Sequence, residues 1–262
     1  MKVTNRWKVV VGALIIQVIL GTVYAYSVFV KPLETEFGWS RATTQWGFSA
    51  ALVTFALTMI PAGRLQDKWG PRKVAIIGGA LLGLAFLLGS VLIAPSRPWA
   101  LYLTYGIIGG AGIGFGYVCP IAASVKWFPD KKGLITGLAV AGFGAGALFF
   151  AGPASELLQP QGTAGSLGIG EVIRVGLGVT QSEGVGIGWR RFFIFHGIVA
   201  AAAVIGGALL LSNPPEGYVP GGYTPPATSA GRKKDYTPLE LLNMPLAGMM
   251  WLTFIFGATS GL

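Results

Sequence analysis

Six long apolar runs constrain this chain more than any other feature, because about 20 such residues cross a lipid bilayer as one helix. The chain is 53% hydrophobic with a mean hydropathy of +0.64, which is too apolar for a water-soluble domain. We therefore predict an all-α membrane protein. The predicted membrane helices cover residues 9–30, 45–62, 74–94, 99–125, 133–155 and 192–211, and a seventh begins near residue 245.

Polar segments divide the chain into three predicted parts. Residues 1–211 form a bundle of six membrane helices, interrupted by a long glycine-rich outer loop over residues 156–190 that is either a lid or a plain insertion. Residues 212–244 are rich in proline, glycine and tyrosine and are predicted to be a cytoplasmic linker. Residues 245–262 would begin a second bundle, so we expect the chain to be the first half of a longer protein.

Lysine and arginine are concentrated on alternate connections. If the N-terminus is cytoplasmic, 13 of the 19 lie on inner segments. The positive-inside rule therefore predicts a multi-pass protein of the plasma membrane, or of the inner membrane in a bacterium, with its N-terminus in the cytoplasm. The net charge of +9 fits contact with anionic lipid. It does not indicate nucleic acid, because no basic stripe or stacking platform accompanies it.

Several site chemistries are not expected. Cys119 is the single cysteine, which excludes an intrachain disulfide and a multi-cysteine metal site. Gly110 and Gly112 lie within a membrane run, without the strand and acidic residue of a dinucleotide site. His196 is predicted to be a packing histidine and not a proton carrier. With no nucleophile and base pair or metal-ligand cluster, we expect neither an enzyme nor a bound cofactor or metal.

Uncharged polar side chains must make any substrate contact, because no charged residue lies deep inside the six runs. At helical spacing, Gln17, Gly21 and Tyr24 share one face of the first run. The pattern Gly-x-x-Tyr recurs in the fourth run at Gly114 and Tyr117, as a three-plus-three inverted repeat would produce. We predict that the two tyrosines lie on either side of a central site; the alternative is that both are packing or interfacial residues.

A polar hairpin at residues 63–73 joins the second and third runs. Five of its 11 residues are charged, against 11% in the whole chain. Gly63 and Gly70 are predicted to allow close backbone approach, and Asp67 to face the N-terminus of a neighbouring helix. A plain basic loop that only sets the orientation remains the alternative.

This hairpin resembles the loop between helices 2 and 3 of the major facilitator superfamily. The chain is also similar, more narrowly, to the oxalate/formate antiporter family and, more loosely, to the monocarboxylate porters. The similarity rests on the hairpin, on Gly21-Thr-Val-Tyr-Ala-Tyr-Ser-Val-Phe29 with Lys31-Pro-Leu33, and on Lys126-Trp-Phe-Pro-Asp-Lys-Lys-Gly133. It implies the N-terminal six-helix bundle of a twelve-helix carrier that works by alternating access.

The resemblance also implies roles for particular residues. Tyr24 and Tyr117 match tyrosines of the carboxylate cavity, while Val23 and Phe143 stand where the family often has hydrogen-bonding residues. A pocket with fewer hydrogen-bonding groups than the family usually has favours a monocarboxylate such as formate, lactate or pyruvate over oxalate. The expected substrate-binding residues are Tyr24, Tyr117, Gln17, Phe143 and Val23, and the expected conformational-switch residues are Gly63, Asp67, Lys68, Gly70, Arg72 and Lys73.

We thus predict a secondary active transporter for small organic anions, or an oxalate/formate exchanger. The alternative is a non-transporting membrane sensor or assembly subunit with a transporter fold. Expected partners are the lipid bilayer, a small carboxylate and the missing C-terminal half, where the family's cationic residues lie on helices 8 and 11.

Overall fold

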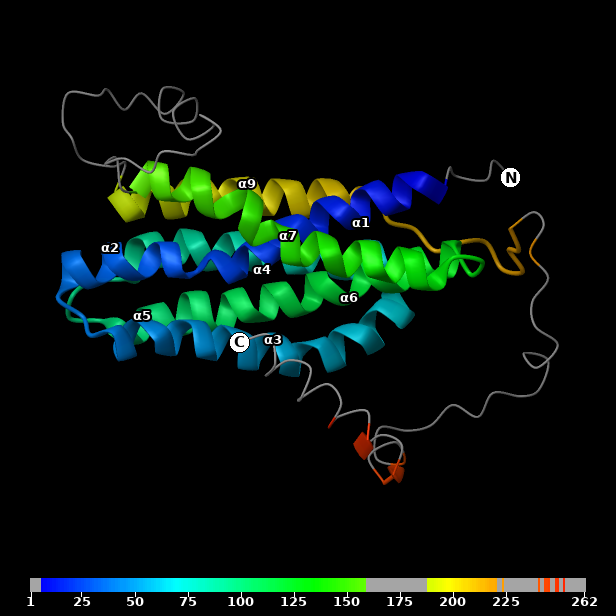
Figure 1. Cartoon of the computed structure of the whole chain (residues 1–262), viewed down its shortest axis with the longest axis horizontal. Coiled ribbons are helices and arrows are strands. Elements are labelled where there is room, and N and C mark those ends of the chain that lie inside the picture. The colour runs from blue at the N-terminus through cyan, green and yellow to red at the C-terminus, as the bar shows by residue number, and fades with distance from the viewer. Residues whose placement is uncertain are drawn as a thin grey trace. The chain divides into compact units, whose positions relative to one another are not determined.

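The computed structural model describes residues 6–158 and 188–220, together with a few isolated positions between 223 and 252. Its ordered elements in this part of the chain are all helical, so the predicted fold class is confirmed. Among the described residues, six helices are long and apolar enough to cross a membrane, and they lie side by side within the unit Met1–Pro220 (Figure 1). Most of the predicted outer loop, the linker and the seventh run lies outside the described residues.

The first membrane span is broken in its middle. α1 (Arg6–Leu20) passes into a 3₁₀ turn, η1 (Gly21–Ala25), and then into α2 (Ser27–Phe37). The helix continues seven residues beyond the predicted end at residue 30, because Lys31, Glu34 and Glu36 are compatible with a helix although not with lipid. Gly38, with a φ of 66°, ends it.

The polar hairpin is mostly helix, which corrects the prediction of a loop. α3 (Arg41–Trp69) runs through its first seven residues, and α4 (Pro71–Leu92) starts immediately after Gly70. Gly70 alone makes the turn, with φ 85° and ψ 158°, a backbone region open essentially to glycine only. Among the described residues the predicted close backbone approach is not found, since a Cβ atom on Gly63 or Gly70 would meet no other described atom within 4 Å.

The fourth span also departs from a regular α-helix. It begins with α5 (Pro98–Leu101), continues as a π-helical stretch, η2 (Tyr102–Gly109), and ends as α6 (Gly110–Trp127). The first and fourth spans are those that the sequence pairs as repeat equivalents, and both carry an irregular segment.

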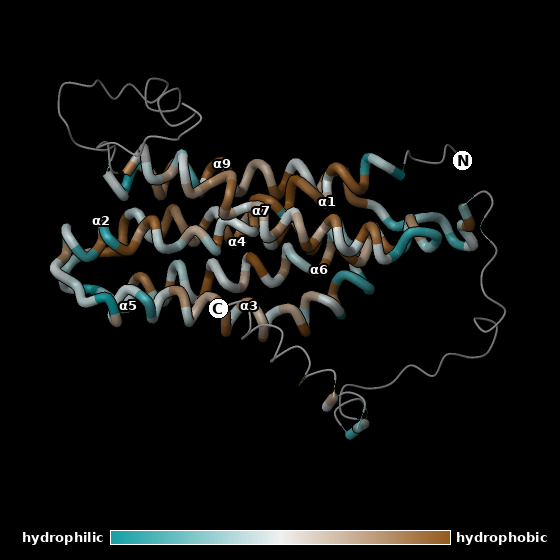
Figure 2. The backbone as a smooth tube through the Cα atoms, viewed as in Figure 1, coloured by the Kyte–Doolittle hydropathy of each residue, from teal (hydrophilic) through white to brown (hydrophobic). Residues whose placement is uncertain are grey.

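The last two described spans are α7 (Lys132–Leu158) and α9 (Gly188–Leu210). Figure 2 shows hydrophilic residues gathered toward the two ends of the bundle, with apolar residues between them. We call the end that carries Arg6, Lys68, Arg72, Lys126 and Lys132 the basic end.

Candidate functional site

Four aromatic side chains from four different spans meet in one cluster. Phe143 of α7 lies between the two predicted tyrosines, with ring centroids 5.2 Å from Tyr24 and 4.8 Å from Tyr117. Phe55 of α3 adds a contact of 5.3 Å to Tyr117. These contacts are edge-to-face, the arrangement that aromatic pairs favour. We call Tyr24, Phe55, Tyr117 and Phe143 the aromatic cluster.

The cluster offers two phenol groups on an open side of the bundle. Tyr24 is 49% exposed, whereas Phe143 behind it is only 5% exposed. Tyr117 and Phe55 are half-buried. Within the part of the chain that the structure describes, neither phenol oxygen has a hydrogen-bond partner. Both hydroxyl groups are thus free to donate to a ligand.

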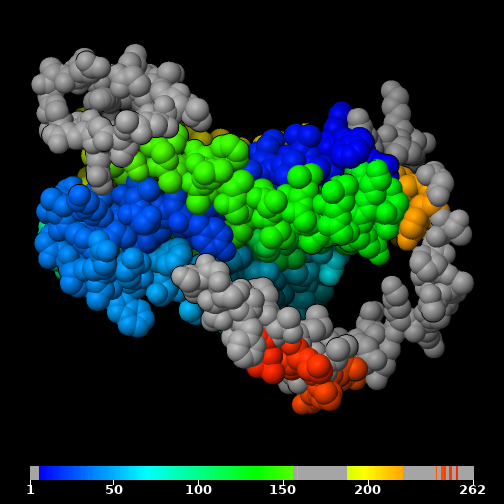
Figure 3. Space-filling view, viewed as in Figure 1, coloured from blue at the N-terminus to red at the C-terminus, as the bar shows by residue number. Residues whose placement is uncertain are grey.

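Glycines bring the first span close enough to α7 to build this cluster. A Cβ atom on Gly21 would overlap the carbonyl oxygen of Phe143, and one on Gly146 would overlap that of Val18. The space-filling view in Figure 3 shows α7, in green, directly against the first span, in blue. Because the two backbones touch, the ring of Phe143 reaches Tyr24.

Gln17 lies behind the cluster and joins α1 to α6. It is fully buried, and its Nε2 atom donates a hydrogen bond of 3.3 Å to the backbone oxygen of Tyr117. Its Oε1 atom has no partner within the described structure. The structure therefore places Gln17 beside Tyr117, where it holds the backbone and does not face the open side.

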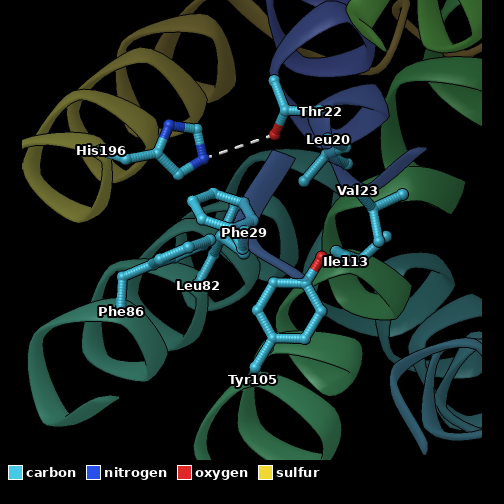
Figure 4. A pocket seen from close by; sticks show the side chains of 10 residues that line it. Leu20, Thr22, Val23, Phe29, Leu82, Phe86, Tyr105, Ile113 and His196 are labelled. Atoms are coloured by element: carbon cyan, nitrogen blue, oxygen red, sulfur yellow. Dashed lines mark hydrogen bonds between the residues drawn. The ribbon is translucent and has the colours of Figure 1, made fainter. Parts of the chain in front are cut away.

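Val23 does not join the aromatic cluster. Its side chain is buried and lines a separate small cavity together with Leu20, Thr22, Phe86 and His196 (Figure 4). The tight turn of η1 turns Val23 inward and Tyr24 outward. Of the five predicted binding residues, the structure brings together Tyr24, Tyr117 and Phe143, sets Gln17 next to them, and separates Val23.

An open groove leads from Tyr117 to the basic end between α3 and α6. Its volume is about 530 Å³. Apart from Tyr117 and a charged pair, the lining is largely apolar. The lining residues are Met59, Gln66, Asp67, Tyr117, Val118, Ile121, Ala122, Val125 and Lys126.

The hairpin residues have definite contacts at this end. Asp67 accepts 3.3 Å and 2.7 Å hydrogen bonds from Lys126 Nζ and Gln66 Nε2. Lys126 is in the last turn of α6, so the helix end that Asp67 contacts among the described residues is a C-terminus. That Asp67 faces a helix N-terminus stays a prediction. Arg72 Nε donates to the backbone oxygen of Leu211 at 3.2 Å. Lys68 and Lys73 are exposed.

Sequence reasoning missed two members of this region. Phe55 gave no signal because it is one apolar residue in an apolar run. Lys126 was noticed as part of the segment Lys126–Gly133, but nothing in the sequence indicated that it would pair with Asp67. Among the described residues, no group of three or more His, Cys, Asp or Glu side chains could hold a metal ion.

Comparison with known proteins agrees with these features. The family model of the Major Facilitator Superfamily matches residues 13–262. The uncharacterised transporter YhjX of Escherichia coli K12, described as MFS-type, is 28% identical over 259 residues, which is 98% of this chain and 56% of that protein. The oxalate:formate antiporter of Oxalobacter formigenes is 35% identical over 161 residues, 60% of this chain and 37% of that protein. The apicoplast pyruvate carrier 1 of Toxoplasma gondii is 37% identical over 122 residues, 46% of this chain and 22% of that protein. The chain thus spans about half, or less, of the length of these relatives.

Proposed function

We propose that this chain, which belongs to the major facilitator superfamily, is the N-terminal half of a secondary active transporter for small organic anions. The most suitable substrates are monocarboxylates such as formate, lactate or pyruvate. Two relatives support this class, because they are named an oxalate:formate antiporter and a pyruvate carrier. Members of the superfamily are transporters, so the chain is not expected to be an enzyme.

The aromatic cluster is the observation that carries this proposal. Tyr24 and Tyr117 can each donate an O–H group to a carboxylate oxygen, and such charge-assisted hydrogen bonds are stronger than neutral ones. Phe143 and Phe55 supply apolar walls for the rest of a small acid. The two hydroxyl donors match the two oxygens of one carboxylate better than they match the four acceptor oxygens of oxalate.

The counter-charge for the substrate has to come from outside these spans. Within the described spans, the charged residues lie at the ends of the helices and not beside the cluster. Burying an unpaired carboxylate is costly, so we expect a cation from the remaining part of the transporter to complete the site. The groove from Tyr117 to the basic end would then be part of the path to the cytoplasm.

Transport by the complete protein in liposomes tests this proposal. We expect uptake of labelled formate, lactate or pyruvate to exceed uptake of oxalate. Tyr24→Phe and Tyr117→Phe should each raise the half-saturation concentration roughly ten- to hundredfold, since a hydrogen bond to a charged group contributes about 1.5–3 kcal/mol.

Tyr102→Phe is the matched control, because that hydroxyl donates to the backbone oxygen of Thr43 at 3.0 Å and is not part of the cluster. Its half-saturation concentration should stay close to that of the unchanged protein. If both cluster variants transport with unchanged affinity, the two-tyrosine site is wrong.

A further inference from the structure

The segment that carries Tyr24 is held from two sides. η1 is a 3₁₀ turn, a conformation with weaker hydrogen bonds than the α-helix and one that seldom persists without support. On one side Gly21 touches the backbone of Phe143. On the other side Thr22 points toward α9 and meets His196 (Figure 4).

The direction of the bond between Thr22 and His196 follows from its neighbours. The Thr22 hydroxyl donates its proton to the backbone oxygen of Ile19 at 2.8 Å. Its oxygen is 3.4 Å from His196 Nε2 and, with its proton already used, can only accept there. His196 therefore donates from Nε2 to Thr22 Oγ1.

His196 is a rigid support because aromatic rings surround it. Its ring centroid lies 4.6 Å from that of Phe86 and 4.4 Å from that of Phe150. Phe192, one turn earlier on α9, stacks at 6.0 Å. The side chain is only 4% exposed. Any shift of Thr22 must therefore either break the bond or repack these rings.

The cavity beside this pair is too small for a carboxylate. Its volume is about 10 Å³, roughly the room that one water molecule needs. His196 consequently does not touch the substrate of the proposed site. Any effect of His196 on the proposed site must therefore be transmitted by its hydrogen bond to Thr22.

We propose that His196 is a positioning residue for Tyr24 and acts through Thr22. Thr22 and Tyr24 are two residues apart on the same 3₁₀ turn, with Thr22 buried and Tyr24 exposed. If the turn relaxed to an α-helix, the rise per residue would fall from about 2.0 to 1.5 Å and Tyr24 would rotate away from Phe143. This inference rests on the proposed function, because it assigns Tyr24 to substrate binding.

A labelling experiment measures this coupling without transport. In the full-length protein with Cys119→Ala and any cysteine of the remaining part also replaced by alanine, Tyr24→Cys would report the position of η1 through its reaction rate with a small charged methanethiosulfonate. We expect Thr22→Val and His196→Leu each to change that rate roughly two- to tenfold, the equivalent of one ordinary hydrogen bond. His196→Gln, which keeps a donor, should restore most of the original rate.

Transport kinetics in the native Tyr24 background provide the second readout. Thr22→Val and His196→Leu should each raise the half-saturation concentration by a similar factor with little change in maximal rate. The half-saturation concentration of the double variant should be no higher than that of the poorer single variant. Thr104→Val is the matched control, because Thr104 is also buried but its hydroxyl donates to Ala100 of its own span at 2.6 Å and, in the described structure, not to another span.

The outcomes separate this inference from the proposed function. If the unchanged protein moves no carboxylate, the proposed function fails, while the labelling rates still test the coupling. If Thr22→Val and His196→Leu label and transport as Thr104→Val does, the positioning role is overturned. Strictly additive effects in the double variant would also contradict it.

Discussion

Gly21 sets how closely the first and fifth spans can pack. Any side chain at this position would overlap the carbonyl oxygen of Phe143. The overlap is with backbone and not with a flexible side chain, so neither helix can yield without moving as a whole. The contact between Tyr24 and Phe143 depends on this absence of a side chain.

Gly21→Ala should therefore destabilise the bundle and disturb the site together. We expect a loss of about 1–3 kcal/mol, as for other overpacked interiors, seen as a lower melting temperature of the purified protein in detergent. Gly137→Ala is the control, since a Cβ atom there meets nothing within 4 Å and alanine favours a helix. Equal melting temperatures for the two variants would refute the packing argument.

Single residues were predictable where a pattern repeats and not where a contact joins distant spans. The repeated Gly-x-x-Tyr pattern singled out Tyr24 and Tyr117, which the structure brings together through Phe143. Phe55 and the Thr22–His196 pair have no such signal, because they meet only after the chain has folded. Val23 was predicted to bind substrate because it precedes Tyr24 in the sequence, but in the 3₁₀ turn its side chain is buried in the interior.

Among the elements, too, features set by composition were predictable and features set by packing geometry were not. Composition predicted all six spans, since length and hydropathy are properties of the sequence itself. It did not predict the 3₁₀ turn η1 or the π-helical stretch η2, because such breaks depend on packing against other helices. The hairpin was predicted as loop from its charges, although arginine and lysine are good helix formers outside the bilayer.

The pair between Asp67 and Lys126 links the basic ends of α3 and α6. Both side chains are well exposed, at 66% and 41%, so the pair contributes at most about 1 kcal/mol to stability. Asp67→Asn should leave the melting temperature nearly unchanged. If the hairpin is a conformational switch, it should instead slow turnover by up to about fivefold with little change in half-saturation.

Glu34→Gln controls for the loss of any surface ion pair. It breaks the 3.3 Å contact with Arg41 at the opposite end of the bundle, where no switching role is proposed. Turnover and substrate affinity should both be preserved. Normal turnover in Asp67→Asn would count against the switch.

At the scale of the whole molecule, the orientation in the membrane follows from charge. Arg6, Arg72, Lys126 and Lys132 lie at one end of the described bundle, and the positive-inside rule predicts that this end faces the cytoplasm. Arg97 lies at the other end, between α4 and α5.

Site-specific labelling of intact cells checks this orientation. With Cys119 and any cysteine of the remaining part replaced, an impermeant maleimide should react with an Arg97→Cys variant in intact cells. A Lys131→Cys variant should react only after the membrane is permeabilised, because its connection would lie inside. The reverse pattern would show that the N-terminus is external.

The bond between Thr22 and His196 has a consequence for the order of assembly. It joins the first span to the sixth, and α1 also packs against α9 through Gly12 and Gly207. During synthesis the first span enters the bilayer while the sixth is still unmade. Tyr24 would thus reach its final place only once α9 has been inserted, so a segment made before five other spans would be among the last to mature.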